Sequence, residues 1–262
     1  MGVMTGKSGL VIGVANDRSY AWYIAKSLAA QGAKMMFTHL PGDKMARRVQ
    51  LALDAMELED KDPWLRPLDA TNEDQIAEVF AEAAEAAGGK LDYLVHSIAF
   101  ADRQFLEIGR FMQTTREAFL QAIEVSAYTL LSMSRAARPH MKGSGSILAM
   151  SYYGAEKVVP GYNVMGVAKA TLEATCRYLA LEMGRDGVRV NVISGGPLRT
   201  LSAMGVGGFG QMLDLVAERS PLGRNIEGTE VGDAAVWLLS DLGTGVTGQT
   251  IYVDSGYSIM GM

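Results

Sequence analysis

The stretch GLVIGVANDRSYAWYIAKSLAAQGAKMMFT, residues 9–38, decides the fold class because it holds a complete strand–helix–strand unit. Residues 9–14 form a short, continuous apolar run, which is typical of a strand buried on both faces. Residues 20–30 have helical periodicity, and Gly32 follows where a left-handed helix cap favours glycine. Residues 34–38 predict the second strand, so the stretch indicates the repeating unit of a parallel α/β sheet.

The same alternation continues to the end of the chain. Further strands are expected at residues 64–68, 91–97, 146–150, 188–193 and 250–253, and further helices at 43–56, 72–87, 116–141, 161–183 and 229–240. Asn72 and Thr229 are the expected helix N-caps, and Gly88 and Gly184 the expected left-handed caps. We therefore predict a single-domain, Rossmann-like, doubly wound parallel sheet of seven strands, with helices on both faces, over residues 1–262.

Composition narrows the function classes. The chain has 262 residues, 48% of them hydrophobic, and a net charge of −5, so it lacks the basic balance expected of a nucleic-acid partner. The single cysteine, Cys176, allows no disulfide or cysteine metal set and is expected to be a buried apolar residue. No signal-like segment and no run of ~20 apolar residues is present. We expect a soluble cytoplasmic protein without a metal, a nucleic-acid partner or a membrane partner.

The least regular stretch is 195–228, which contains Gly205, Gly207, Gly208 and Gly210. It follows the carboxyl end of a predicted strand, where sheets of this class bind ligands. We interpret it as a lid over a site, around residues 198–225. An ordinary glycine-rich surface loop is the alternative.

The loop after the first strand is a candidate pyrophosphate site. Gly13, Ala15 and Ser19 are small, and the loop leads into a helix N-terminus, which attracts phosphate. The usual Gly-x-Gly-x-x-Gly is absent, so a loop without a nucleotide is the alternative. After the second strand, Leu40 and Pro41 offer no charge to a 2′-phosphate, which favours NADH over NADPH.

Two polar residues at strand ends have open roles. Asp69, after the third strand, suits either an adenine amino group or a helix cap. His96, at the end of the fourth strand, is interpreted as a core histidine rather than a catalyst.

Tyr162 and Lys169 are the candidate catalytic pair. Seven helical residues span about two turns, which would place both side chains on one face. A phenol beside a cation can stabilise or protonate a developing oxyanion. Tyr152, at the end of the fifth strand, brings a second phenol near the same cleft, although a packing tyrosine would look the same. Thr200 follows the sixth strand and offers a hydroxyl to a cofactor.

Together these features resemble the enoyl-acyl-carrier-protein reductases of type II fatty-acid synthesis, a divergent branch of the short-chain dehydrogenase/reductases. The resemblance covers essentially the whole chain. It is carried by Gly13-x5-Ser19-x-Ala21, His96-Ser97-Ile98-Ala99-Phe100-Ala101, Ser151-Tyr152-Tyr153-Gly154-Ala155-Glu156, the stretch from Gly161 to Ala170, and Gly196-Pro197-Leu198-Arg199-Thr200-Leu201. Members of the superfamily's main branch have three residues between the tyrosine and the lysine, whereas this chain has six, which marks the enoyl-reductase branch.

The resemblance implies roles for individual residues. Tyr152, Tyr162 and Lys169 would be catalytic, and Ala101, Tyr152 and Tyr162 would contact the thioester substrate. The implied NADH contacts are Gly13, Ser19, Tyr20, Leu40, Asp69, Ala70, Ile98, Lys169, Leu198, Thr200, Leu201 and Ser202. Acyl-carrier protein would present the enoyl chain, and the enzyme would be a homotetramer.

The chain departs from the family pattern at three places. Leu40 stands where relatives often have glutamine, residues 207–211 lack the basic side chains that could face a carrier protein, and Asp254-Ser255-Gly256 replaces a double glycine. Arg219 and Arg224 are the alternative cations for docking. Ser255 would then need an allowed backbone conformation or a shifted turn.

Two other functions remain open from the residues alone. One is a short-chain oxidoreductase acting on a carbonyl or alcohol, and the other is a catalytically silent dinucleotide-binding or scaffold protein. Turnover of a crotonyl thioester would separate the leading hypothesis from both.

Overall fold

A computed structural model describes residues 2–56, 58–60, 62–141, 143–200, 204 and 208–261. Its centre is a parallel seven-stranded sheet in the order β3-β2-β1-β4-β5-β6-β7. The strands are β1 Ser8–Ile12, β2 Lys34–His39, β3 Leu65–Pro67, β4 Tyr93–His96, β5 Gly145–Ser151, β6 Val188–Gly195 and β7 Thr250–Val253. The order reverses between β1 and β4, so a crevice is expected at the carboxyl ends of these strands. The predicted fold class is confirmed.

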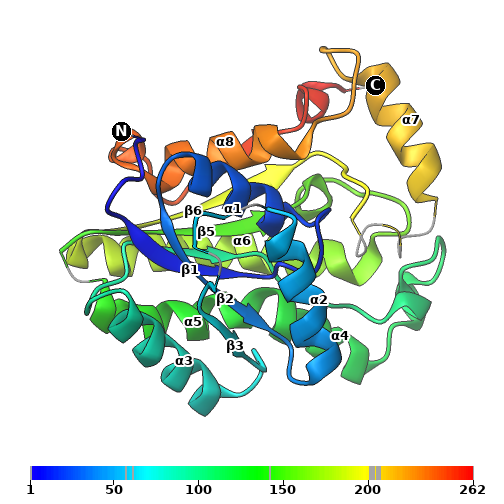
Figure 1. Cartoon of the computed structure of the whole chain (residues 1–262). Helices are drawn as coiled ribbons and strands as arrows, with labels where there is room; N and C mark the ends of the chain where they lie inside the picture. Colours follow the sequence, from blue (N-terminus) through cyan, green and yellow to red (C-terminus); the bar gives the residue numbers. More distant parts are fainter. Residues whose placement is uncertain are drawn as a thin grey trace.

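Helices cover both faces of the sheet (Figure 1). They are α1 Tyr20–Ala30, α2 Asp43–Asp54, α3 Glu73–Ala86, α4 Arg116–Ile123, α5 Thr129–Ala137, α6 Asn163–Met183, α7 Phe209–Arg219 and α8 Gly228–Leu239. Along β1, Leu10 packs in the core with α3, α5 and α6, whereas its neighbour Val11 packs in the core with α1, α2 and α8. This alternation explains why the strand is apolar throughout. Cys176 is buried in the first of these cores, as expected.

The single helix expected at 116–141 is wrong, because the segment changes helical type three times. α4 ends at Ile123, a π-helical turn covers Glu124–Tyr128, and a 3₁₀ turn at Arg138–His140 follows α5. Directly after the π-helical turn, the Thr129 hydroxyl donates to Val125 O (2.8 Å) and contacts the buried His96 Nε2 (2.8 Å). The π-turn thus supplies a partner to a polar side chain inside the core.

The irregular stretch expected at 195–228 is also partly wrong. Residues 209–219 form helix α7, which buries Phe209, Leu213 and Val216 at helical spacing. α7 stands at the carboxyl ends of the strands, apart from the two helical layers (Figure 1). The glycines before α7 favoured the prediction of a loop, since glycine is a poor helix former.

Two expected caps are corrected by the structure. α8 is capped by Glu227 rather than Thr229, through a reciprocal capping box with Glu230. Gly184 is not left-handed; a 3₁₀ turn extends α6, and Gly187 takes the left-handed conformation (φ 76°). Gly32 (φ 84°) and Gly88 (φ 86°) are left-handed as expected. None of the helices that the structure describes has both the length and the apolar character needed to traverse a lipid bilayer.

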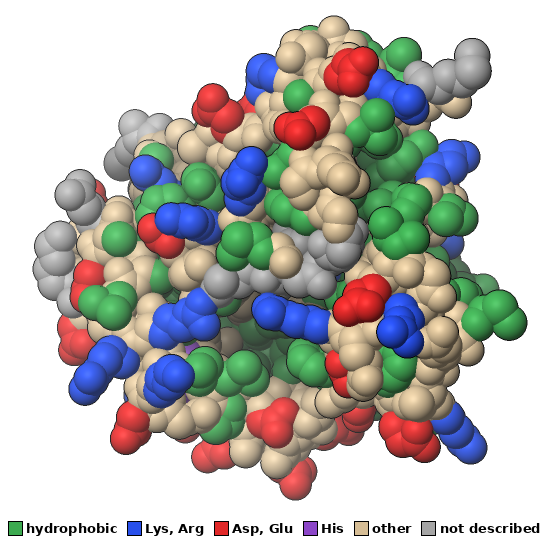
Figure 2. All heavy atoms as spheres, turned by 90° about the vertical axis from the view of Figure 1, so that its right-hand side faces the viewer, with side chains coloured by type: hydrophobic (Ala, Val, Ile, Leu, Met, Phe, Trp, Pro, Cys, Tyr) green, Lys and Arg blue, Asp and Glu red, His purple; other side chains and the backbone are tan. Residues whose placement is uncertain are grey.

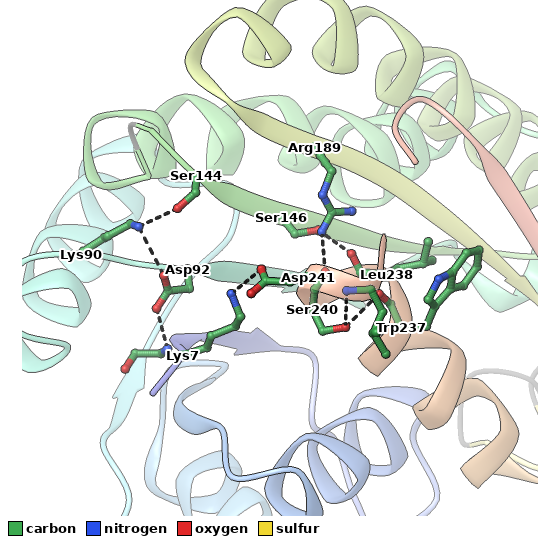
Figure 3. A network of polar contacts seen from close by, with 12 residues as sticks. Lys7, Lys90, Asp92, Ser144, Ser146, Arg189, Trp237, Leu238, Ser240 and Asp241 are labelled. Atoms are coloured by element: carbon green, nitrogen blue, oxygen red, sulfur yellow. Dashed lines mark hydrogen bonds and ion pairs between the residues drawn. The ribbon is translucent and has the colours of Figure 1, made fainter. Parts of the chain in front are cut away.

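Paired charges lie where the strands begin, at what is called here the amino edge of the sheet (Figure 3). Lys7 Nζ lies 2.8 Å from Asp241 Oδ1. Lys90 Nζ lies 3.5 Å from Asp92 Oδ1 and donates to Ser144 Oγ at 2.7 Å. The Asp92 carboxylate also accepts the Ser8 N–H at the start of β1 (2.9 Å). These contacts tie the strand starts to the loops that precede them.

Candidate active site

A cleft opens at the opposite, carboxyl edge of the sheet. Its walls come from the loop after β1, the ends of β4, β5 and β6, the start of α6, and α7. The face of the molecule in Figure 2 is hollowed, with hydrophobic side chains inside the hollow and Lys and Arg side chains around it. Among the described residues, no group of three or more His, Cys, Asp or Glu side chains could hold a metal ion.

The loop after β1 suits a phosphate. Gly13 has φ 111°, and a Cβ there would lie 2.1 Å from Ser97 O, so only glycine fits. Ser19 is the N-cap of α1, and its hydroxyl donates to Asn16 O (2.9 Å). Gly13 and Ser19 both line the cleft, where the N-terminus of α1 favours negative charge.

Tyr20 links the first helix to the end of β6. Its hydroxyl donates to the backbone carbonyl of Gly196, and its ring would meet any Cβ at Gly195 within 3.1 Å. Burial raises the pKa of Tyr20, so the phenol stays protonated. Tyr20 lines the cleft and also keeps this wall in place.

Tyr152 and Tyr162 meet edge to face at the floor of the cleft, with ring centroids 5.0 Å apart and an interplanar angle of 70°. The Tyr152 hydroxyl donates to Met212 Sδ on α7 (3.0 Å). Burial raises the pKa of both phenols, so both remain donors at neutral pH. Within the described part of the chain the Tyr162 hydroxyl has no hydrogen-bond partner, which leaves it available to a ligand.

Lys169 is buried on α6 and lines the same cleft. Its Nζ donates to Met150 O (2.7 Å). Burial lowers the pKa of Lys169 to about 8, and the nearby Glu173 carboxylate opposes that shift. Glu173 in turn accepts the Ser151 hydroxyl (2.5 Å). Sequence reasoning missed Glu173, although a carboxylate four residues after a helical lysine lies on the same face.

Comparison with known proteins identifies the family of this chain. The family model described as Enoyl-(Acyl carrier protein) reductase matches residues 13–258. The NADH-type enoyl-[acyl-carrier-protein] reductase FabI of Bacillus cereus is 47% identical over all of both chains, and that of Nostoc is 46% identical over 99% of each.

This chain belongs to the enoyl-(acyl carrier protein) reductase family. Solved structures agree with that assignment. The Bacillus cereus enoyl-acyl carrier protein reductase, solved with NADP+ and indole naphthyridinone, superposes with a TM-score of 0.95 at 46% identity, covering 100% of both chains. The Anaplasma phagocytophilum reductase, solved with NAD, superposes with a TM-score of 0.93 at 44% identity, covering 100% of this chain and 97% of that one.

In this enoyl reductase the cleft brings together seven of the sequence-predicted residues besides Tyr152 and Tyr162. These residues are Gly13, Ser19, Tyr20, Ile98, Lys169, Leu198 and Thr200. Sequence reasoning missed the apolar cleft residues Leu106 and Met165, which no motif marks. Phe209 and Met212 also line the cleft and fall within the stretch 198–225.

The remaining predicted residues lie elsewhere. Leu40, Asp69 and Ala70 follow β2 and β3 at the carboxyl edge but do not line the cleft, and Leu40 is exposed. Asp69 Oδ1 accepts from Thr71 N (2.9 Å) and Thr71 Oγ1 (2.7 Å), and these bonds lower the pKa of the Asp69 carboxyl. The cap of α3 is Asn72, so the helix-cap alternative for Asp69 is wrong.

Ala101 is buried in a small apolar cluster with Leu106 and Val164 rather than on the cleft wall. Leu201 and Ser202 lie outside the described residues. His96 is buried and neutral as expected, because burial and the nearby Lys169 lower its pKa to about 3.

Proposed function

We propose that this enoyl reductase uses NADH to reduce the C2=C3 double bond of trans-2-enoyl thioesters carried on acyl-carrier protein. The observation that carries the proposal is the Tyr162 phenol, which burial holds protonated in the cleft and which has no hydrogen-bond partner among the described residues. Lys169 opens on the same cleft from the same helix. A donor placed where negative charge develops is a strong source of transition-state stabilisation.

The residues present fit NADH. Gly13 allows close backbone approach, the α1 N-terminus faces the pyrophosphate position, and Lys169 Nζ would reach the ribose hydroxyls. Leu198 and Thr200 would flank the nicotinamide, and Leu40, Asp69 and Ala70 would face the adenosine. Bound NADH supplies the hydride. Leu40 carries no cation for a 2′-phosphate, which supports NADH over NADPH.

The chemistry at the substrate is charge stabilisation. When C3 receives the hydride, the double-bond electrons move toward the thioester, and negative charge builds on its oxygen as an enolate. The Tyr162 O–H donates to that oxygen, and Lys169 adds positive potential nearby. C2 then takes a proton, and the enolate collapses to the saturated thioester. Tyr152 and Ala101 would contact the acyl side.

The wider organisation follows the same proposal. One domain holds cofactor and substrate, and residues around 198–225, including α7, form a lid over the acyl chain. Met212 supports a lid, since its flexible thioether already contacts the Tyr152 hydroxyl.

Arg224 forms an ion pair with Glu230 (2.6 and 2.9 Å), so Arg219 is the better candidate to bind an acidic carrier protein. Exposed Tyr178 and Leu181 on α6 support a homotetramer, and we place the enzyme in the cytoplasm.

The test is oxidation of NADH and NADPH at 340 nm with crotonyl-CoA, in the wild type, Tyr162→Phe and Lys169→Ala. We expect NADH-linked turnover that falls about 100-fold or more in Tyr162→Phe, the scale of a lost acid catalyst. Turnover of ketones or alcohols instead would support a carbonyl oxidoreductase. Cofactor binding without turnover of crotonyl-CoA or of a crotonyl-carrier protein would contradict the proposal.

A further inference from the structure

Asn163, the residue after Tyr162, has an unusual backbone. Its φ is 46°, and among the described non-glycine residues only Ser255 shares a positive φ. Left-handed geometry is unfavourable for residues with a Cβ, although asparagine tolerates it better than most. Such a conformation persists only where the surroundings hold it, and it is often found at functional sites.

The Asn163 side chain does not cap its own helix. α6 has no side-chain cap, although asparagine at a helix start commonly accepts a backbone N–H. Instead, Nδ2 donates outward to Phe105 O (2.7 Å) and Glu107 O (2.8 Å). Both amide protons therefore hold one loop, and Leu106, between the two accepting residues, lines the cleft.

The same residue controls how the chain enters α6. Tyr162 lies between two left-handed residues, Gly161 (φ 83°) and Asn163. The Tyr162 N–H donates to Val159 O, and its carbonyl accepts Met165 N–H, both at 3.0 Å. The phenol is therefore aimed by this double turn before the helix begins, and not by helical periodicity alone.

The phenol ring is also tightly confined. A Cβ at Gly154 would lie 2.3 Å from Tyr162 Cδ1, so the ring packs directly on the Gly154 backbone. A small rotation of the turn would drive the ring into that backbone or away from it. The direction of the O–H therefore depends on the backbone angle that Asn163 holds.

We propose that Asn163 is a positioning residue, which locks the turn that aims Tyr162 and fastens the Leu106 wall of the cleft to that turn. Asn163 does not line the cleft and acts on the thioester oxygen only through Tyr162. This inference rests on the proposed function of Tyr162 as the donor to the thioester oxygen.

The central variant is Asn163→Gly, because glycine accepts the left-handed backbone and removes both amide donors. Asn163→Ala removes the donors and adds backbone strain, and Asn163→Asp keeps the shape but sets a carboxylate against two carbonyls. With crotonyl-CoA we expect kcat to fall about tenfold or more in Asn163→Gly, with the NADH dissociation constant within twofold of wild type. The other two variants should fall further.

A double-mutant cycle tests whether Asn163 acts through Tyr162. In a Tyr162→Phe background, Asn163→Gly should lower kcat less than twofold further. Equal falls in both backgrounds, an unchanged kcat in Asn163→Gly, or a loss of NADH affinity matching the loss of kcat would overturn the proposal.

Hydrogen exchange separates this proposal from the assigned activity. Amides of residues 103–108 should exchange faster in Asn163→Gly than in wild type, whether or not crotonyl-CoA is turned over. A wild-type chain without turnover would count against the proposed function alone. Unchanged exchange at 103–108 would overturn the link between Asn163 and the cleft wall.

Discussion

The two edges of one sheet treat polar groups in opposite ways. At the amino edge, charges are paired, and each pair has one exposed and one half-buried member, as in Lys7–Asp241 and Lys90–Asp92 (Figure 3). At the carboxyl edge, Lys169 is buried and Tyr162 is half-buried in a cleft, and desolvation shifts the pKa of each away from its charged form. The paired charges of the amino edge connect the strand starts to neighbouring loops. The groups in the cleft remain available to a ligand, and burying them costs stability.

The difference has a simple physical origin. A charge near water gains little from a partner, but it also loses little when the partner is removed. A buried donor or cation interacts strongly with whatever enters the cleft, because the surroundings have a low effective dielectric constant. Substitutions at the carboxyl edge should therefore change activity, and substitutions at the amino edge should leave it unchanged.

The largest expected effect comes from Gly154→Ala. The new Cβ would lie 2.3 Å from Tyr162 Cδ1, so the phenol must move. We expect kcat with crotonyl-CoA to fall about 100-fold, the scale of a lost acid catalyst. Steady-state kinetics would measure it.

The matched control is Gly184→Ala at the amino edge, where the structure places nothing within 4 Å of the new Cβ and φ is −58°. Its kcat should be unchanged, with stability raised by up to about 1 kcal/mol. Equal losses of kcat in the two variants would contradict the distinction between the edges.

The next effect is on the pH dependence of NADH binding. The pKa of Lys169 is about 8, so its charge is lost as pH rises through that value. Burial raises the pKa of Tyr162, so the phenol does not titrate first. We expect the KM for NADH to rise about tenfold per pH unit above pH 8.

Two variants sharpen this pH test. Lys169→Arg keeps its charge, so its KM for NADH should not rise above pH 8. Glu173→Gln removes a carboxylate that raises the Lys169 pKa, so the rise in KM should begin at a lower pH. A flat KM to pH 10 in the wild type would count against a charged Lys169 in cofactor binding.

A smaller effect is expected on the stability of the enzyme without ligand. The pKa of Lys169 falls from 10.5 to about 8 on folding, so the unfolded chain binds more protons between those pH values. Stability therefore rises with pH across this window, and at pH 7 the charged lysine destabilises the fold. Lys169→Met should raise the free energy of unfolding by about 2 kcal/mol at pH 7, after loss of the bond to Met150.

Urea unfolding at pH 7 and pH 10 would measure this gain. It should shrink at pH 10, where the wild-type lysine is mostly neutral in the folded state. Destabilisation at both pH values would show that the bond to Met150 outweighs the burial of the charge.

The smallest effect is expected at the amino edge. Lys7 and Asp241 form an ion pair whose aspartate is 83% exposed. A cycle of Lys7→Met, Asp241→Asn and the double variant should give a coupling of about 0.5 kcal/mol, weaker in high salt. Chemical unfolding would measure it, and kcat should stay at the wild-type value in all three variants. A coupling above about 2 kcal/mol would place this edge outside the range of exposed ion pairs.

Much of the fold was predictable because local pattern and burial agree. Helix α1 and strand β7 begin and end at the predicted residues, and the parallel order follows from strand–helix alternation. The segment 116–141 was not predictable in detail, because the contact that follows the π-turn joins Thr129 to His96, 33 residues apart. Helix α7 was hidden by its glycine-rich approach and is identified by the apolar side it buries.

For the site, the sequence by itself determined the residue types and their strand-end positions, including Tyr162 and Lys169. Only the tertiary structure decided how those groups are held. Tyr20 reaches Gly196 across 176 residues, and Asn163 reaches Phe105 across 58. Packing also decided that Lys169 is buried, which lowers its pKa, while the charge of Glu173 opposes that shift. Periodicity encodes which side of an element is buried, but contacts between distant segments and the dielectric around them arise only when the chain is packed.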